Sequence, residues 1–584
     1  MCAIAGIIAF DGRVSPQMLH AMAIRQAHRG PDGSGEWISK DGRVGFAHRH
    51  LAILDLTDRA AQPMSNRDGT VHLVYNGEIY NFRELRRELE KGGCEFISDS
   101  DTEVLLHGYE AWGPAVVSRL RGMFAFAIWD EPKRRLVLAK DRLGVKPLYY
   151  ARDSKTFSFA SELKGIEAGP LENRALDPGA IYDFLTYLYV PTPKTPYRAV
   201  RKLPPASILI LEQGIERIET YWDARFDGSR RGREEDLVLE LRSKLEDAVK
   251  SHLVSDVPVG ILLSGGLDSS TVAAFAGRGA KTFSVGFDRG RSEIGFARRI
   301  AERFGAAHAE AVLRTADVPT DLQRMIAWYD EPHYDTSAFP TSLVCRTARR
   351  DVKVALSGDG GDEVFGGYAH YAKFAGLDRR NPIPAGIGKA ALRMGEGILK
   401  RALRGVERYA FLLGGMTRVE KEVRLPPEVN SRFADYDDYW LFRRYWREDL
   451  DTLSRLQYLD LKTYLPDDIL TKMDRVGMET SLEVRVPLLD TPLVEFVCAI
   501  PSEQRAPEGP PKHLLRKAMA GLLPPETLSR KKRGFSVPSE TWLGDSASHR
   551  GWRRPHRVAW RILDLWAAKK TGSDGALEIL RSGP

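Results

Sequence analysis

Residues 257–275 read VPVGILLSGGLDSSTVAAF, and this stretch decides the fold of the C-terminal part of the chain. The apolar run 257–263 is typical of a buried strand, and a helix is expected to start near Thr271. The turn between them, 264–270, is rich in glycine and serine, so that backbone N–H groups and hydroxyls can approach a polyphosphate at the positive end of the helix. No Gly-Lys-Ser/Thr follows, as a Walker loop would require. The stretch predicts a phosphate-binding turn of another kind, and a plain glycine-rich turn is the alternative.

A second turn of similar composition follows another apolar strand. Residues 352–356 read VKVAL and are followed by SGDGGDE at 357–363. With a further strand expected at 282–287 and helical segments between, the pattern predicts a parallel α/β sheet with ligands at the carboxyl ends of its strands. Acidic side chains opposite a phosphate loop would offer Mg²⁺ the oxygen ligands that it prefers. Two unrelated turns with capping aspartates are the alternative, but they do not explain why both strand ends carry such turns.

The first 211 residues show a different hydrophobic pattern, in which short apolar runs are separated by turn residues. Helices are expected at 82–91 and 102–112, and a hairpin from the runs 123–129 and 136–140, which together favour antiparallel sheets covered by helices. Prolines cluster at 191–205 and a polar stretch covers 223–233, as in a linker. We therefore predict three parts: an N-terminal domain at 1–212, a linker at 213–233 and a second domain at 234–584. Further strands are expected at 4–10, 71–75, 157–161 and 208–211.

The bulk composition is that of an ordinary globular protein. The net charge of +7 comes from 86 basic and 79 acidic side chains, and no RNA-binding module accompanies this small excess, so we expect no nucleic-acid partner. Four widely spaced cysteines indicate a reducing compartment. No run is long and apolar enough to span a membrane, and no signal peptide is recognisable. We expect a cytoplasmic protein without a membrane partner, and interpret the basic segment 384–404 as a solvated helix.

Cys2 directly follows the initiator methionine and is small enough to permit its removal, so the mature chain would begin with cysteine. A thiol and a free α-amino group would then share one residue. Because an α-amino group has a pKa near 8, it can accept the thiol proton and later deliver it to a leaving group. A cysteine at position 2 also occurs by chance, so the hypothesis of an N-terminal nucleophile depends on other motifs.

Those motifs are present. HRGPD at 28–32, YNGEIYN at 75–81, DTE at 101–103, DRLGVKPLY at 141–149 and FASE at 159–162 resemble, in order and spacing, the class II glutamine amidotransferases, and specifically the glutamine-hydrolysing asparagine synthetases. In the second domain the two phosphate-type turns, with 464–475, 483–490 and 530–535, resemble the same family. The resemblance therefore extends over both domains.

The resemblance implies a fold of class α/β and α+β in two domains. The N-terminal domain would be a four-layer αββα sandwich of antiparallel sheets, of the N-terminal-nucleophile hydrolase type. The C-terminal domain would be a parallel-sheet α/β domain like that of the adenine-nucleotide hydrolases, with extra helices. A homodimer is compatible with the family.

The resemblance also implies roles for individual residues. The Cys2 thiol would attack glutamine, and the Asn76 amide with the Gly77 N–H would stabilise the oxyanion, which needs preorganised donors. Asp359 and Lys532 would act in the synthetase reaction, Lys532 on pyrophosphate, although a basic run can also be a solvated face. The remaining glutamine-binding residues would be His50, Glu78 and Asp101. ATP would be bound by Leu262, Ser264, Gly265, Gly266, Asp268, Ser269, Val285, Ser357 and Gly358, and Mg²⁺ by Asp268 and Asp362.

The sequence departs from the family pattern at three places. Ala3 stands where the family has glycine, which places a Cβ beside the nucleophile. His50 stands where an arginine clamps the glutamine carboxylate; histidine is mostly neutral near pH 7 and is not bidentate. The chain after Leu543 is also shorter than the usual helical end of the family.

These expectations combine into one reaction. Cys2 would release ammonia from glutamine, the second domain would adenylate L-aspartate with ATP and Mg²⁺, and ammonia would pass through a channel to give L-asparagine, AMP and pyrophosphate. Three alternatives stay open: the same chemistry on another carboxylate such as a sugar acid or a peptide, intramolecular ring closure as in the β-lactam synthetases, and an ATP-dependent RNA-modifying protein. A non-catalytic scaffold would have damaged loops, and both loops look intact.

Overall fold

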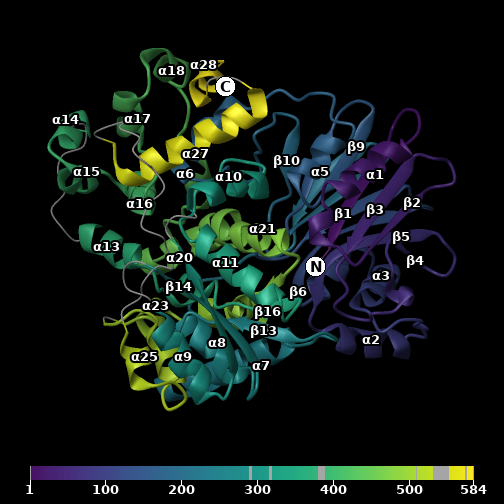
Figure 1. Ribbon diagram of the computed structural model, residues 1–584, viewed down its shortest axis with the longest axis horizontal. Helices are drawn as coiled ribbons and strands as arrows, with labels where there is room; N and C mark the ends of the chain where they lie inside the picture. Colours follow the sequence, from purple (N-terminus) through teal and green to yellow (C-terminus); the bar gives the residue numbers. More distant parts are fainter. Residues whose placement is uncertain are drawn as a thin grey trace.

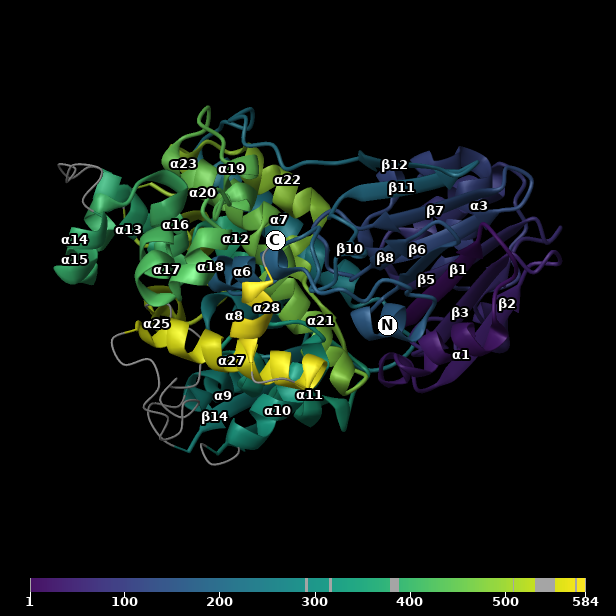
Figure 2. The same cartoon turned by 90° about the horizontal axis from the view of Figure 1, so that it is seen from above.

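The computed structural model describes residues 2–288, 293–314, 318–378, 388–507, 509–530, 552–572 and 575–582. Two lobes lie side by side, with the antiparallel sheets of the N-terminal part in one and a parallel sheet surrounded by helices in the other (Figures 1 and 2). Among the described residues no helix is long and apolar enough to cross a membrane.

The N-terminal domain has four layers. Apolar side chains of the two six-stranded antiparallel sheets, among them Ile4, Phe46 and Val74, form a core between the sheets. One sheet has the strand order β10 (Val200–Lys202), β8 (Tyr149–Arg152), β9 (Thr156–Ala160), β1 (Ala3–Ala9), β3 (Val44–His50) and β2 (Gly33–Ile38). The other has the order β12 (Ile215–Thr220), β11 (Ser207–Glu212), β7 (Arg135–Lys140), β6 (Gly122–Asp130), β5 (Val71–Ile79) and β4 (Met64–Ser65).

Helices cover the outer face of each sheet. The outer face of the first packs against α1 (Pro16–Ile24) and α5 (Leu163–Ala168). That of the second packs against α2 (Phe82–Lys91), α3 (Asp101–Trp112) and α4 (Val116–Arg119). The predicted αββα sandwich is confirmed, as are both predicted helices and the hairpin, which is the pair β6–β7.

The C-terminal domain is built on a five-stranded parallel sheet. Its strand order is β15 (Ala307–Leu313), β14 (Lys281–Phe287), β13 (Val259–Leu262), β16 (Val354–Leu356) and β17 (Glu483–Arg485). The chain winds outward from β13 through β14 to β15, then returns to place β16 on the other side of β13. Ligands of open parallel sheets bind at such a switch point, and both glycine-rich turns follow the two strands that form it.

Helices cover both faces of this sheet. One face packs against α7 (Glu234–His252), α8 (Leu267–Phe275), α9 (Ile294–Arg303), α22 (Thr491–Ala499) and α24 (His513–Ala518). The other packs against α6 (Pro178–Tyr187), α10 (Val318–Tyr329), α11 (Ala338–Arg349), α21 (Thr471–Glu479), α27 (Arg554–Thr571) and α28 (Ala576–Arg581).

The remaining helices, with one exception, lie outside the layers described so far. They are α12 (Gly361–Phe365), α13 (Ala369–Asp378), α14 (Gly388–Arg393), α15 (Glu396–Ala402), α16 (Gly405–Leu413), α17 (Arg418–Arg424), α18 (Pro427–Arg432), α19 (Trp440–Tyr445), α20 (Thr452–Lys462), the π-helical turn Leu465–Leu470, α23 (Ser502–Arg505) and α25 (Pro525–Ser529). The exception is α12, which packs into the core shared by α7 and α8. The helices α13 to α17 form a helical lobe on one side, and α25 lies apart from them, beside α9 (Figure 1).

Two details differ from the local sequence patterns. Asn76 and Gly77, a common hairpin dipeptide, lie inside the continuous strand β5, because β6 pairs with them directly. A Cβ on Gly77 would lie 2.2 Å from the Met123 carbonyl oxygen, so the glycine permits this close strand approach. The strand β12 occupies part of the segment 213–233, because Gln213 and Gly214 form a tight turn with positive φ that returns the chain along β11.

The two domains share one core. Ile181, Tyr182 and Phe184 of α6 pack among the side chains of α10, α11 and α27, although α6 lies within the first 212 residues. This packing joins the N-terminal domain to the sheet that carries the phosphate-type turns.

Candidate active sites

Cys2 lies at the start of β1, and its side chain is 8% exposed. Its backbone N–H donates to Asn76 Oδ1 at 2.9 Å, and its carbonyl accepts from Arg29 Nε at 3.1 Å. With Oδ1 occupied in this way, Asn76 Nδ2 is buried and has no hydrogen-bond partner among the described residues. An unpaired buried donor costs free energy unless a ligand satisfies it. Asn76 is thus arranged to donate to an oxygen next to Cys2.

The backbone of β5 supplies a second donor. Tyr75 N–H donates to Gln62 Oε1 and Ile79 N–H donates to Asp101 Oδ2, at one edge of the strand. Because alternate N–H groups of a strand point the same way, the Gly77 N–H points to that edge as well. The structure therefore brings Cys2, Asn76 and Gly77 together as predicted from the motif.

Asp101 is held against the same strand. Its Oδ2 accepts from the Tyr75 hydroxyl at 2.7 Å and from the Ile79 N–H at 2.9 Å, and the residue is 5% exposed. Burial raises the pKa of Asp101 to about 6, although both hydrogen bonds stabilise the carboxylate. Both bonds are on Oδ2, so no donor among the described residues occupies Oδ1, which leaves it for an ammonium group.

The two residues that depart from the family pattern flank Cys2. Ala3 is buried in β1 with ordinary extended backbone, paired with Arg49, so its Cβ is accommodated without positive φ. The same register places His50 across from Cys2 at the end of β3. Burial lowers the pKa of His50, although the Cys2 thiol opposes the shift. His50 is therefore a neutral ring near pH 7.

The Glu78 side chain reaches the other domain. Its Oε2 lies 2.8 Å from Arg485 Nη2, and Arg485 Nε lies 2.6 Å from Glu483 Oε1. All three side chains are almost fully buried. The Arg485 carbonyl in turn accepts the Ser357 N–H at 2.8 Å. Glu78 thus connects the oxyanion strand β5 to the second phosphate-type turn.

The first phosphate-type turn is closed by its own hydroxyls. Ser269 Oγ lies 3.0 Å from Ser264 Oγ and accepts the Ser264 N–H at 3.2 Å. Gly265 has a φ of +72°, and a Cβ there would lie 2.5 Å from the Ala297 nitrogen. A Cβ on Gly358 would lie 2.6 Å from the Ser269 nitrogen, so the second turn approaches the start of α8. The two turns form one site.

Two carboxylates meet at this site across a lysine. Lys512 Nζ lies 2.5 Å from Asp268 Oδ2 and 2.7 Å from Asp362 Oδ1. Burial favours the neutral amine, but the two carboxylates outweigh it and raise the pKa of Lys512. Over the described residues no group of three or more His, Cys, Asp or Glu side chains could hold a metal ion. Two carboxylates within reach of one cation fit Mg²⁺ bound jointly by protein, phosphates and water.

Lys512 was missed in the sequence. It lies just before α24 with a φ of +60°, and a Cβ on Gly367 would lie 2.0 Å from its Cε, so Gly367 makes room for its side chain. The sequence signal was a lone lysine between Pro511 and His513. The predicted Lys532 lies outside the described residues.

The other predicted residues lie around the two turns. Leu262 and Val285 are buried in adjacent strands at the switch-point edge. The Ser357 hydroxyl donates to Asp359 Oδ2. Gly266 caps α8 ahead of Asp268.

A small cavity lies between the domains. It has a volume of about 20 Å³, room for about one water-sized molecule. Arg29, whose Nε donates to the Cys2 carbonyl, also binds Asp474 of the cavity wall, at 2.7 Å from Nη1. Lys472 lies two residues before Asp474 in the same helix α21, and it interacts electrostatically with Asp359 of the second phosphate-type turn. The cavity is lined by Lys140, Gly144, Val145, Pro147, Leu148, Tyr149, Lys202, Asp467, Thr471, Asp474 and Arg475.

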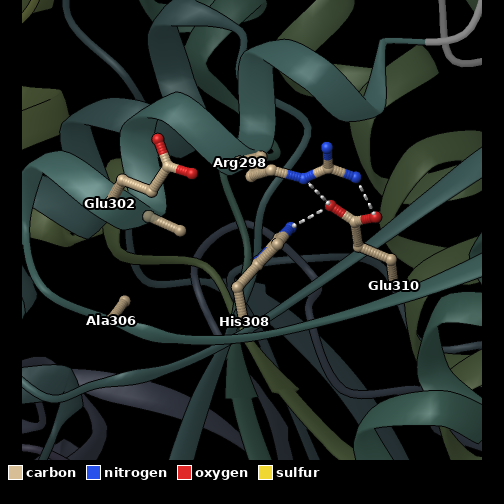
Figure 3. A pocket seen from close by; sticks show the side chains of 6 residues that line it. Arg298, Glu302, Ala306, His308 and Glu310 are labelled. Atoms are coloured by element: carbon tan, nitrogen blue, oxygen red, sulfur yellow. Dashed lines mark hydrogen bonds and ion pairs between the residues drawn. The ribbon is translucent and has the colours of Figure 1, made fainter.

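A larger pocket, of about 390 Å³, lies between α9 and the edge strand β15. Arg298 and His308 both contact the Glu310 carboxylate there (Figure 3). The His308 nitrogens also contact the hydroxyls of Thr282 and Ser284. None of the predicted site residues lines this pocket, and we assign no chemistry to it.

Comparison with known proteins agrees with this arrangement. The family model described as "Asparagine synthase" matches residues 240–561, and that described as "Glutamine amidotransferase domain" matches residues 1–222. Asparagine synthetase [glutamine-hydrolyzing] 1 of Bacillus subtilis is 37% identical over 88% of this chain and 83% of its own. A putative asparagine synthetase of Mycobacterium tuberculosis is 35% identical over 93% and 88% of the two chains. One of Methanocaldococcus jannaschii is 34% identical over 83% of this chain and 100% of its own. The chain belongs to the asparagine synthase family of carbon–nitrogen ligases, with a glutamine amidotransferase domain at its N-terminus.

Proposed function

We propose that the protein is a glutamine-dependent asparagine synthetase, which converts ATP, L-aspartate, L-glutamine and water to AMP, pyrophosphate, L-asparagine and L-glutamate. The observation that carries the proposal is the pairing of two sites in one chain. Cys2 with the unpaired Asn76 amide forms one, and Asp268 with Asp362 at the sheet switch point forms the other. The names of the relatives support aspartate as the acceptor.

The first site releases ammonia. With the methionine removed, the Cys2 amine takes the thiol proton, and the thiolate attacks the glutamine carboxamide. The oxyanion accepts hydrogen bonds from Asn76 Nδ2 and the Gly77 N–H; loss of one such donor costs about 10²–10³ in rate. The C–N bond breaks as the amine returns the proton to the leaving nitrogen. Water then hydrolyses the thioester to glutamate and restores Cys2.

The second site activates the acceptor. Asp268 and Asp362 would hold Mg²⁺, which when bound neutralises charge on the ATP phosphates. The acceptor carboxylate displaces pyrophosphate from the α-phosphate and forms an acyl-adenylate. Lys512 lies between both carboxylates, where it can neutralise the negative charge that develops on the leaving pyrophosphate. Ammonia then attacks the acyl carbon, AMP leaves, and Asp359 takes the surplus proton from the nitrogen.

Ammonia must cross from one domain to the other. The cavity beside α21 is lined in part by Asp474, which pairs with Arg29, the residue that donates to the Cys2 carbonyl. It has room for about one molecule of the size of ammonia. A buried passage along α21 would keep ammonia from dilution in solvent.

The test is pyrophosphate release by the purified protein with ATP, Mg²⁺ and ammonium across a panel of carboxylates. Aspartate should give the largest kcat/KM, with AMP formed in equal amount. Formation of ADP and phosphate would contradict the adenylation chemistry. A uronic acid or a peptide with a higher kcat/KM would replace aspartate as the acceptor and leave the two-site chemistry in place.

A further inference from the structure

Lys472, on α21, lies among more carboxylates than it can neutralise. Its Nζ lies 3.1 Å from Asp335 Oδ2 and 2.9 Å from Ser337 Oγ. Although burial favours the neutral amine, Asp335, Asp359 and Asp468 together raise the pKa of Lys472. One lysine cation thus faces three carboxylates in a site that is closed to most solvent, since its side chain is only 6% exposed.

The cluster lies at the edge of the sheet where the chemistry is placed. Asp335 and Ser337 immediately precede α11, which runs back from the carboxyl edge of the sheet to the start of β16. Asp359, in the turn after β16, belongs to the ATP site through its neighbour Gly358. Lys472 and Asp335 therefore lie next to the ATP site, on the side where α21 packs.

We propose that Asp335 and Lys472 form the acceptor-binding site, and that they select an α-amino acid with a second, side-chain carboxylate. Asp335 binds the α-ammonium group and Lys472 the α-carboxylate, which directs the side-chain carboxylate toward Asp359 and the α-phosphate of ATP. This inference rests on the proposed function and adds the recognition of its acceptor.

The charge of the cluster favours an amino acid over a sugar acid. Buried charges are stable when they are paired. Burial raises the pKa of Asp468, but Asp335 and Asp359 around the one lysine still leave negative charge in the cluster. His333 Nε2 lies 3.0 Å from Asp468 Oδ1. An α-ammonium group supplies the missing positive charge at Asp335. A sugar acid would bring a carboxylate and hydroxyls but no cation.

Two analogues of aspartate test each half of the site. Succinate lacks the ammonium group and β-alanine lacks the α-carboxylate. Their inhibition constants against aspartate are measured by ammonium-driven pyrophosphate release in the full-length enzyme and in Asp335→Asn and Lys472→Met. The matched control is Asp438→Asn, which removes one partner of another buried Lys–Asp pair, 2.6 Å from Lys421 in the helical lobe. Glutaminase activity and thermal unfolding report on folding.

Asp335→Asn should raise the KM for aspartate about ten- to hundredfold and leave the inhibition constant of succinate unchanged. Lys472→Met should raise the KM for aspartate and the inhibition constant of succinate, but leave that of β-alanine unchanged. The KM for ATP should not move in either variant. A loss confined to kcat, or equal losses for aspartate and the matching analogue, would overturn the assignment. A wild-type enzyme that releases pyrophosphate with no amino acid would instead overturn the proposed acceptor, before any variant is compared.

Discussion

His50 stands at the end of β3, across from Cys2, where the family pattern has an arginine. The partial burial of the ring determines its charge and therefore how it can bind a carboxylate. A half-buried imidazole with a lowered pKa is neutral near pH 7 and offers one hydrogen bond. An arginine in the same place would be charged and bidentate. We therefore expect this enzyme to bind glutamine weakly, and we expect His50 alone to account for the low affinity.

His50→Arg should lower the KM for glutamine about ten- to hundredfold, because it restores a charge-assisted bidentate contact of about 1.5–3 kcal/mol. Glutaminase kinetics measure this directly. His20→Arg, at an exposed histidine that pairs with Glu36, is the control and should change nothing. An unchanged KM in His50→Arg would mean that Arg49 already binds the carboxylate or that the pocket is built differently.

We expect Asp101 to set the acidic limit of glutamine use. In its proposed role it must be ionised to bind the glutamine ammonium group, and burial raises its pKa to about 6. The kcat/KM for glutamine should therefore fall as pH drops through about 6. Protonation of His50 would strengthen binding of the glutamine carboxylate. Because the pKa of His50 is lowered, it becomes protonated only at a pH where Asp101 is already losing its negative charge. An improvement in glutamine affinity between pH 7 and pH 6 would contradict this assignment.

At the scale of elements, the synthetase site depends on two strand-to-helix turns that approach each other closely. Gly360 has a φ of +86°, and a Cβ there would lie 2.2 Å from Leu489 Cγ. Gly277 has a similar φ of +94° in the same domain but has open space around it. Alanine substitutions at Gly360 and Gly277 therefore separate the destabilisation caused by backbone strain from that caused by a clash in the site.

Gly277→Ala should lower the free energy of unfolding by about 1 kcal/mol through backbone strain alone. Gly360→Ala adds a clash with Leu489, so we expect a loss of about 2–4 kcal/mol and a strong loss of pyrophosphate release with glutaminase activity retained. Denaturant unfolding and the two activity assays measure both effects. Equal destabilisation by the two variants would mean that the turn adapts to the added methyl group.

Lys512 and the two aspartates that it joins should act as a unit. Asp268→Asn, Asp362→Asn and Lys512→Met should each reduce pyrophosphate release at least about a hundredfold and spare glutamine hydrolysis, because they lie only in the ATP site. Lys517→Met, at a half-exposed lysine 3.1 Å from Glu234, is the control. A Lys512→Met enzyme with normal synthesis would show that the lysine only balances the aspartates when no metal is bound.

At the scale of the whole molecule, one buried ion pair joins the oxyanion strand of the first domain to the ATP turn of the second. Arg485 binds Glu78 through its side chain and Ser357 through its carbonyl. Arg485→Met should destabilise the protein by about 3–5 kcal/mol, because it removes the cation that lies 2.8 Å from the buried Glu78 carboxylate. It should also lower the amount of pyrophosphate formed per glutamate released.

A double-mutant cycle tests this link. Adding Glu78→Gln to Arg485→Met should restore part of the lost stability, because it removes the carboxylate that Arg485 pairs with. The free energy of unfolding of the four proteins measures the coupling. Additive losses would mean that the two side chains do not depend on each other.

The sequence allowed prediction of what is local and not of what folding brings together. The turns at 264–270 and 357–363 each carry their chemistry within seven residues, and the strands that precede them place both at one sheet edge. Lys512 reaches the same site from 244 residues after Asp268, with no motif to mark it. The packing of α6 into the second domain and the pair Glu78–Arg485 likewise depend on how two domains dock, which no periodicity encodes.

The central claim is that one chain carries two separable reactions linked by ammonia, and Cys2→Ala tests it most directly. Asparagine formation by this variant is measured with glutamine and, separately, with ammonium, at equal ATP, Mg²⁺ and aspartate. Glutamine should support no synthesis, since the nucleophile is gone, and ammonium should support it at the wild-type rate. Loss of both activities together would contradict two separable sites, and synthesis from glutamine would show that Cys2 is not the nucleophile.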